Sequence, residues 1–379
     1  MNTVEYILIA TAGGFVVILV IILIVVGIVK RGQQRYDPVP EKGNVFIYQK
    51  DNSESIKEDT IMMNARFYLR STMYSLQDRI PRFGSRVDKI YFSILNNSPQ
   101  ANINGNKRAQ LDNERIMSMV TVSKSWPIPL YTEIGRSTLK TIVKSLEVHP
   151  FISVPLVVDF IPDKYSAVSI RPFYPKGSLR DFIHQSRPKM AYNDKYATHF
   201  SLSEKLISKF GRQILEALIF LKMNNFPYYH LNCANILVDD QSCLISDYEN
   251  AFLGLKPRIS GLLMPFAEKM DLEVLSFGAV LFEMACGYEL ESAESLDSAI
   301  PSHCNPEVRK VLESIFKPWY GVPPTLDDLT KMDFFSSHKF KNLPFSSLTY
   351  TSKEREMIDA ASKLNQSFLG SKKRSQCKG

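Results

Sequence analysis

The chain has 379 residues, of which 45% are hydrophobic and 11% aromatic, so it can fold around a large core and is not a disordered protein. Its net charge is +7, with 46 basic and 39 acidic residues spread along the sequence, which gives no indication of nucleic-acid binding. The five cysteines contain no CxxC pair and no zinc-ligand spacing, so we expect reduced thiols in the cytosol.

An uncharged stretch runs from Tyr6 to Val29 near the N-terminus. As a helix its 24 residues would extend roughly 36 Å, against about 30 Å for the hydrocarbon core of a bilayer. A cleaved signal peptide is the alternative, but a charged n-region and an A-x-A cleavage site are missing. We therefore predict a single transmembrane helix over residues 6–29.

The charges that flank this stretch predict its orientation. Glu5 is the one charged residue before it, whereas Lys30, Arg31 and Arg35 follow it. Because basic residues favour the cytoplasmic side of a membrane, residues 1–5 should lie outside and the rest of the chain in the cytoplasm. The sequence thus predicts a single-pass membrane protein.

Polar and charged residues without periodicity follow over 30–60 and predict a juxtamembrane linker. From about residue 61 the pattern becomes globular, with four strand-like runs and one helix before residue 171. The runs cover 91–95, 117–123, 155–161 and 165–170, and the helix follows Ser137, with Leu139, Ile142, Val143 and Leu146 at helical spacing.

The pattern after residue 171 is mainly helical. Ser201-x-x-Glu204 is typical of a capping box, and a stripe of apolar residues follows it. Residues 273–287 are apolar on nearly every face, which indicates a helix at the centre of a lobe. We expect an α+β fold with a small lobe over 61–170, a large lobe over 171–340, and a polar, basic tail over 341–379.

The order of these elements resembles a eukaryotic protein kinase. The closest resemblance is to the Slowpoke-binding protein and PX-domain kinase-like family. It is carried by ARFYLRSTMYSL (65–76), SKSWPIPL (123–130), HLNCANILVDD (230–240) and ISDYENAFLGL (245–255). The resemblance implies a bilobal kinase-like fold, with a small β-rich lobe, a hinge and a helical lobe. We expect no PX domain before the kinase-like region of this sequence. The predicted membrane helix stands at that place, so the mode of membrane targeting should differ.

The resemblance also assigns roles in the stretch 228–252. Asn235 matches the metal-binding Asn of the kinase motif H-R-D-L-x-x-x-N, and Asp247 matches the Asp of Asp-Phe-Gly. These two residues would hold Mg²⁺ and so bind Mg-ATP. Equally open is a local role, in which Asn235 caps the loop and Asp247 forms local hydrogen bonds. His230 stands at the position of the catalytic base, where we expect a structural or vestigial residue in preference to a catalytic one.

Other parts of a kinase site are altered. No G-x-G-x-x-G occurs in residues 61 to 125, so the backbone cradle for phosphates is not evident. Lys124 is the best candidate for the lysine that contacts the nucleotide phosphates. Its expected Glu partner is missing from the body of the following helix, so an ordinary exposed lysine is the alternative. Glu249 replaces the mobile Gly of Asp-Phe-Gly, and Asn232 replaces the lysine near the transferred phosphate.

The substrate-docking platform of a kinase is altered too. No Ala-Pro-Glu occurs between Asp247 and Glu273, and Pro323 stands where a kinase has the Arg that pairs with that Glu. Both partners of this buried ion pair are therefore absent together, which a core tolerates better than the loss of one partner.

These observations predict a membrane-anchored cytoplasmic pseudokinase that acts as a binding scaffold or regulator. ATP binding without transfer is a second possibility, and a weak Ser/Thr kinase that uses His230 is the alternative. The family resemblance implies membrane-protein partners such as the Slowpoke potassium channel, and the sequence indicates no nucleic-acid partner.

Overall fold

The structure, a computed structural model, describes residues 52–370. Within this range it leaves out 87, 99–112, 192–193, 197, 267–269, 291–299, 303, 319–320, 341–342 and 345–346. The predicted transmembrane helix over 6–29 and most of the predicted linker lie outside the described residues. No helix in the described part of the chain is both long and apolar enough to cross a bilayer.

A five-stranded antiparallel sheet forms the small lobe, with strand order β1-β2-β3-β5-β4. The strands are β1 (Tyr74–Ile80), β2 (Ile90–Asn96), β3 (Glu114–Thr121), β4 (Val157–Ile161) and β5 (Ser166–Pro172). The last four confirm the predicted runs. Strand β1 was not predicted, because Ile80 is its one fully buried residue and its apolar alternation is weak.

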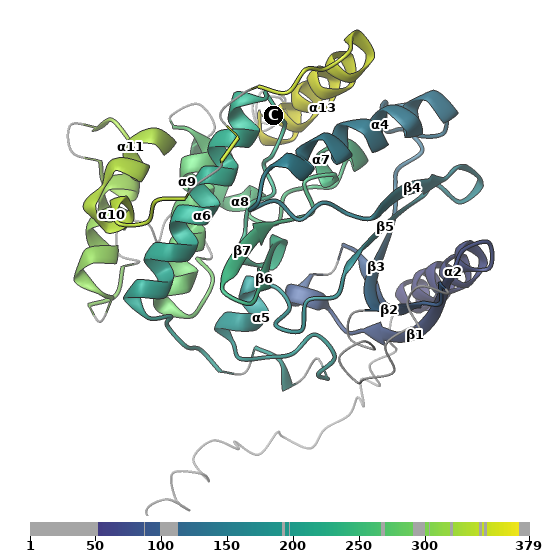
Figure 1. Cartoon of the computed structure of the whole chain (residues 1–379), viewed down its shortest axis with the longest axis horizontal. Helices are drawn as coiled ribbons and strands as arrows, with labels where there is room; N and C mark the ends of the chain where they lie inside the picture. The colour runs from purple at the N-terminus through teal and green to yellow at the C-terminus, as the bar shows by residue number, and fades with distance from the viewer. Residues whose placement is uncertain are drawn as a thin grey trace, which may run out of the picture. The chain divides into compact units, whose positions relative to one another are not determined.

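Helices α2 (Asn52–Leu69) and α4 (Glu133–Ser145) cover opposite faces of this sheet (Figure 1). Met117 and Met119 of β3 pack with Ala65 of α2, whereas Val120 belongs to the core that contains Ile142 of α4. This division follows from the strand, since successive side chains point to opposite faces. The small lobe therefore has an apolar layer on each side of its sheet.

Two helix boundaries differ from the sequence prediction. Helix α2 begins at Asn52, within the predicted linker, because Ala65 and Leu69 bury its inner face on the sheet. Helix α4 begins at Glu133, before the predicted start after Ser137. The Thr132 side chain accepts a hydrogen bond from the backbone N–H of Gly135 at 3.0 Å and so caps the helix there.

The described residues of the large lobe form helices and one hairpin. In chain order it contains α5 (Leu179–Ile183), α6 (Glu204–Met223), η6 (Cys233–Asn235), β6 (Ile236–Asp239), β7 (Ser242–Ile245), α7 (Asn250–Leu253), α8 (Ser260–Leu263), η7 (Met264–Phe266), α9 (Leu272–Cys286), α10 (Pro306–Phe316), α11 (Leu326–Lys331) and α12 (Asp333–Ser336). Helix α9 lies at the centre of the lobe as predicted, with every residue from Val274 to Cys286 buried. The predicted capping box at Ser201 is not formed, because Ser203 is the N-cap residue of α6 and its side chain makes no capping bond.

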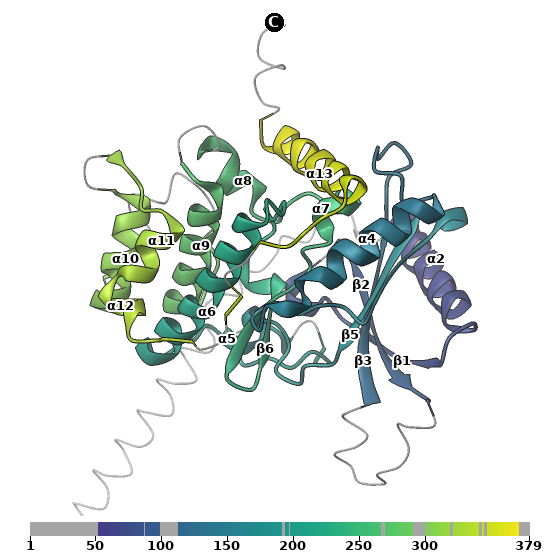
Figure 2. The ribbon, with the colours of Figure 1, turned by 45° about the horizontal axis from the view of Figure 1, so that its top comes forward.

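The predicted polar tail contains a long packed helix, α13 (Ser352–Gly370). It lies against α4 and α7, as Figure 2 shows. Asn365 is 1% exposed and donates a hydrogen bond from Nδ2 to the carbonyl oxygen of Ala251 at 2.8 Å. The prediction of a tail was therefore wrong for this segment, because few but regularly spaced buried residues are enough to dock a polar helix. The two-lobed α+β architecture is the one that the kinase resemblance implies.

Candidate functional site

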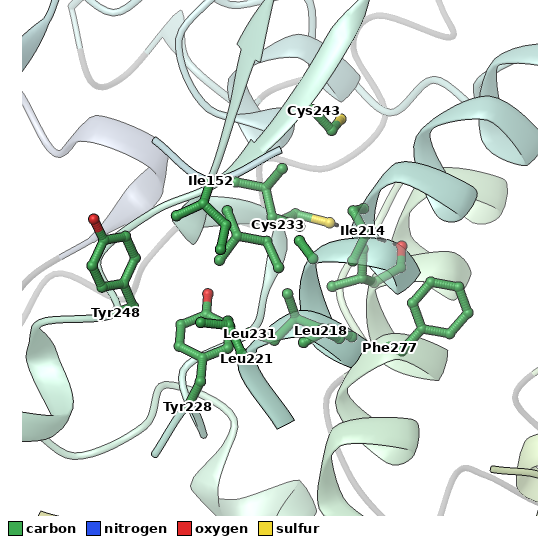
Figure 3. Close-up of a cluster of buried hydrophobic side chains, with 14 of the residues drawn as sticks. Ile152, Ile214, Leu218, Leu221, Tyr228, Leu231, Cys233, Cys243, Tyr248 and Phe277 are labelled. Carbon is green, nitrogen blue, oxygen red and sulfur yellow. Dashed lines mark hydrogen bonds between the residues drawn. The ribbon is translucent and has the colours of Figure 1, made fainter. Parts of the chain in front are cut away.

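The candidate site begins with a loop held by the core of the large lobe. Figure 3 shows Tyr228, Leu231 and Cys233 beside Leu218 and Leu221 of α6. Tyr228 is 2% exposed, and its hydroxyl donates to the carbonyl oxygen of Ser246 at 3.3 Å. Burial of these side chains fixes the loop backbone between α6 and the β6-β7 hairpin.

Two amide side chains brace this loop. Asn232 Oδ1 accepts from the N–H of Ala234 at 2.9 Å, and Asn232 Nδ2 donates to the carbonyl oxygen of His230 at 2.9 Å. Asn235 Nδ2 donates to the same carbonyl oxygen at 2.7 Å, which leaves its Oδ1 free for another donor. Asn232, which stands where kinases have a phosphate-contacting lysine, is thus a structural cap.

The β6-β7 hairpin brings Asp247 next to Asn235. The N–H of Ser246 donates to the carbonyl oxygen of Asn235 at 2.9 Å, so the two metal-type residues expected from the sequence are neighbours. Asp247 has φ 58°, in the left-handed region that non-glycine residues adopt at a cost. This backbone strain at a buried carboxylate is typical of a functional position.

Arg86, from the segment between β1 and β2, binds both of these residues. Its Nη1 donates to Asn235 Oδ1 at 2.5 Å and to Asp247 Oδ2 at 2.7 Å. Its Nε and Nη2 donate to the carboxylate of Asp88 at 3.1 and 2.7 Å. Arg86 is 4% exposed, so its charge is neutralised by these carboxylates and not by water.

Lys89 binds the second carboxylate oxygen of Asp247. Its Nζ lies 2.6 Å from Asp247 Oδ1 and 3.4 Å from Glu249 Oε1. Arg171 of β5 then pairs with the other oxygen of Glu249 at 2.6 Å. Arg86, Lys89 and Arg171 therefore balance Asp88, Asp247 and Glu249 in one ion network.

The charges in this network hold its carboxylates ionised. Burial alone would raise the pKa of Asp247, but the charges of Arg86, Lys89 and Arg171 outweigh burial and hold it well below its usual range. Burial would also raise the pKa of Glu249, but the charges of Arg171 and Lys89 outweigh burial and lower it. Glu249, which replaces the mobile glycine of a kinase, is thus locked by two cations.

The same segment, between β1 and β2, packs against the loop that contains Asn235. Gly84 has φ 56°, and a Cβ there would meet Ala234 Cβ and Ser178 Oγ at 2.9 Å, so backbone fills the space beside the loop. Lys195 of the large lobe donates to the carbonyl oxygen of Pro81 at 3.0 Å and so holds the start of the segment. The chain has no G-x-G-x-x-G motif in residues 61 to 125, and the turn around Gly84 packs inward against Ala234 and Ser178.

The contacts of Asn235 and Asp247 leave no place for the magnesium ion of Mg-ATP. Magnesium takes oxygen ligands at about 2.0–2.1 Å and needs them free of competing cations. Here Asn235 and Asp247 direct their oxygens to the guanidinium of Arg86 and the ammonium of Lys89. The arrangement does not fit a magnesium ion, because two side-chain cations already supply the positive charge and the hydrogen-bond donors.

His230 is buried beside this network at 2% exposure. Its Nε2 has no hydrogen-bond partner among the described residues. Burial, reinforced by the charge of Arg86, lowers the pKa of His230 to about 3. The imidazole is therefore neutral and a very weak base at neutral pH. It lines a small pocket of about 220 Å³ together with Arg86, Asp88, Asn235, Lys256 and Arg258.

The structure brings His230, Asn235 and Asp247 together, but not Lys124. Lys124 is exposed beyond the end of β3, with its Nζ 5.1 Å from the ring centre of Tyr165. Sequence reasoning missed Arg86, Lys89 and Arg171, which make the contacts to the acidic residues. The one local signal was a pair of basic residues in RVDK, directly before the strand-like run at 91–95.

The segment after Asp247 is tied to both lobes. Trp126, in SKSWPIPL, donates from Nε1 to the carbonyl oxygen of Phe252 at 2.8 Å. Further along, Arg258 makes two hydrogen bonds of 2.9 Å to Glu289, and Glu289 also pairs with Arg180 at 2.8 Å. The expected loss of the Ala-Pro-Glu ion pair thus coincides with a different ionic attachment of this segment.

No protein-family model matches the chain. It is 65% identical over 344 residues to the probable inactive serine/threonine-protein kinase slob2 of Dictyostelium discoideum, an alignment that covers 90% of this chain and 58% of that protein. It is 31% identical over 226 residues to Slowpoke-binding protein of Drosophila melanogaster, covering 56% of this chain and 44% of the relative. It is 36% identical over 197 residues to the PX domain-containing protein kinase-like protein of Mus musculus, covering 50% and 33%. The alignments cover between one third and somewhat over half of the length of these relatives.

Proposed function

The chain belongs to the family of kinase-like proteins that includes slob2, Slowpoke-binding protein and the PX domain-containing protein kinase-like proteins, and we propose that it is a pseudokinase that acts as a binding scaffold. A scaffold needs a stable surface and no phosphoryl transfer. The kinase-like relatives support the fold, and the name of slob2 includes the words "probable inactive".

The observation that carries this proposal is the double contact of one nitrogen. Arg86 Nη1 donates to both Asn235 and Asp247, the two residues that match kinase metal ligands. Phosphoryl transfer depends on a metal that bridges the nucleotide phosphates, together with a base or orienting carboxylate. His230 at the base position has a pKa of about 3, because it is buried next to Arg86. ATP binding in the kinase manner would first require Arg86 and Lys89 to leave these oxygens.

Phosphate transfer and ligand binding test this function together. The purified full chain is incubated with radiolabelled Mg-ATP and a basic protein substrate, and its melting temperature is measured with Mg-ATP, with ATP and EDTA, and without ligand. We expect no transfer and no rise in melting temperature. A ligand at about 100 times its Kd would add about 2.7 kcal/mol to the free energy of unfolding, so binding would be seen.

An active kinase would give a different result. Transfer that disappears in Asp247→Ala, while the variant still folds by circular dichroism, would contradict the scaffold proposal. A melting-temperature rise without transfer would support a nucleotide-dependent switch in place of a silent scaffold. The control is Asp327→Ala, an acidic residue in the first turn of α11 and outside the ion network.

We also propose that the scaffold is anchored by residues 6–29 and binds a membrane-protein partner. The support is the uncharged stretch and the name of Slowpoke-binding protein, a relative that matches 56% of this chain. Alkaline extraction of cell membranes should leave the full chain in the membrane pellet and release a chain without 6–29. Co-purification with a Slowpoke-type potassium channel should be lost when residues 61–340 are deleted. Equal recovery would contradict binding through residues 61–340, and no recovery with the full chain would contradict the channel as partner.

A further inference from the structure

The outer face of α2 carries large apolar side chains that the fold leaves in water. Met63 is 70% exposed and Phe67 is 64% exposed, and they lie four residues apart on one side of the helix. Met73, in the turn after the helix, is 57% exposed. The inner face of α2 packs on the sheet through other side chains, Ala65 and Leu69. The outer side chains are therefore not needed for the core.

Basic side chains alternate with these apolar ones. Arg66 and Arg70 are both exposed, and neither forms an ion pair with a residue in the described part of the chain. The acidic residues of α2 come earlier in the helix, the last of them at Asp59. The second half of the helix thus combines apolar and unpaired cationic side chains on one exposed surface, which is the combination of interfacial helices.

We propose that residues 63–73, the outer surface of α2 and the following turn, lie on an anionic membrane leaflet, with Met63 and Phe67 in the headgroup region and Arg66 and Arg70 on lipid phosphates. Each arginine near an anionic surface favours contact by about fivefold, and the pair by about 25-fold. Figures 1 and 2 show α2 at the end of the domain opposite to α10 and α11, so this surface is not covered by the large lobe.

The position of α2 in the chain favours a membrane over a protein as the occupant. It begins at Asn52, and 22 residues (30–51) separate it from the uncharged stretch that ends at Val29. Such a connection can extend up to about 70 Å, so α2 is within reach of any bilayer in which 6–29 is inserted. Insertion would raise the local concentration of this surface at the membrane. The proposal goes beyond the scaffold function and does not depend on whether the chain transfers phosphate.

Tryptophan quenching by labelled lipids tests the contact directly. Phe67→Trp keeps an aromatic apolar residue in place, and Val322→Trp puts the same probe at a position that is 73% exposed in the large lobe. Each full-length variant is reconstituted in vesicles of phosphatidylcholine and phosphatidylserine that contain doxyl-labelled lipid, and the signal of the parent chain is subtracted. A side chain in the headgroup region lies within reach of the quencher, so we expect at least roughly twofold stronger quenching at residue 67 than at 322.

Two further measurements separate the surface from the anchor. Arg66→Glu with Arg70→Glu should reduce quenching at residue 67 in phosphatidylserine vesicles, while flotation of the chain with the vesicles is unchanged. A chain that does not float with the vesicles would show that the prediction of an anchor over 6–29 is wrong. In that case, vesicles added to the soluble chain should still quench the tryptophan at residue 67. Equal quenching at 67 and 322 overturns the proposal, and so does quenching at 67 that is the same with and without phosphatidylserine.

Discussion

Arg86 and Asp247 form an ion pair between the two lobes, with 2.7 Å from Nη1 to Oδ2 and with both side chains at most 6% exposed. The guanidinium belongs to the segment that follows β1, and the carboxylate follows β7 of the large lobe. By the resemblance to kinases, Asp247 matches a metal ligand. Arg86 binds one of its oxygens, so the pair is a contact that joins the lobes.

The first prediction concerns the stability that this pair provides. Arg86→Met leaves Asp247 with less compensation in a buried place, so the free energy of unfolding should fall by about 3–5 kcal/mol. Urea denaturation measures it. Lys310→Met is the control, because its pair with Glu307 is exposed and should contribute little. An equal loss of unfolding free energy in Arg86→Met and Lys310→Met would show that the buried Arg86 pair contributes no more stability than an exposed pair.

Removal of both cations should create a metal site that the parent chain lacks. In Arg86→Met with Lys89→Met, the oxygens of Asn235 and Asp247 lose their donors and become available to a divalent ion. Manganese should then raise the melting temperature of the double variant, and EDTA should reverse the rise. The same rise in the parent chain would contradict the inference that Arg86 and Lys89 exclude metal.

Gly84 tests the inward packing of the β1-β2 segment. Gly84→Ala adds a Cβ 2.9 Å from Ala234 Cβ at a residue with φ 56°, so we expect a loss of about 1–3 kcal/mol in the free energy of unfolding. Gly261→Ala is the matched control, because nothing lies within 4 Å of a Cβ there. A neutral Gly84→Ala with unchanged structure would mean that the segment does not pack as described.

His230 should make folding less stable in acid. Its pKa in the folded chain is about 3, below the ordinary value near 6.5, so the unfolded chain binds more protons between these pH values. Stability should therefore fall as the pH drops through 6.5 toward 3. Between pH 7 and 5 this residue should account for about 2 kcal/mol of the loss.

The variant His230→Leu isolates this effect. Because Nε2 has no partner among the described residues, the variant should keep its stability at pH 7 and lose about 2 kcal/mol less than the parent between pH 7 and 5. Glu273 acts in the opposite direction, since burial raises its pKa to about 7 and its protonation in acid favours the folded chain. Glu273→Gln is therefore the companion variant. Identical pH profiles for parent and His230→Leu would exclude the proposed role of His230.

Asn365 should anchor α13 to the segment after Asp247. Asn365→Ala removes the hydrogen bond to Ala251 and leaves its buried carbonyl oxygen without this donor, so the free energy of unfolding should fall by about 1–3 kcal/mol. Hydrogen exchange should also become faster in α13. Lys363→Ala, two positions before Asn365 in α13 and exposed, is the control and should change neither quantity.

Local patterns in the sequence determined much of this protein. Apolar alternation predicted β2 to β5, and the uniformly apolar run predicted the central helix α9. The adjacency of Asn235 and Asp247 also follows from local spacing, because they flank a short hairpin. The polar helices α2 and α13 were not predicted, since each is held by a few contacts to distant segments.

The occupant of the candidate site was decided by the tertiary structure alone. Arg86 is 149 residues from Asn235 and 161 from Asp247, and Lys89 is 158 from Asp247. Periodicity reports which face of an element is buried, but not which distant cation reaches a carboxylate. That choice depends on how the β1-β2 turn packs against the loop, where burial of the charges allows only a paired arrangement. The sequence therefore determined where a metal-type pair of oxygens would form, and the packing of the lobes decided that two side-chain cations fill it.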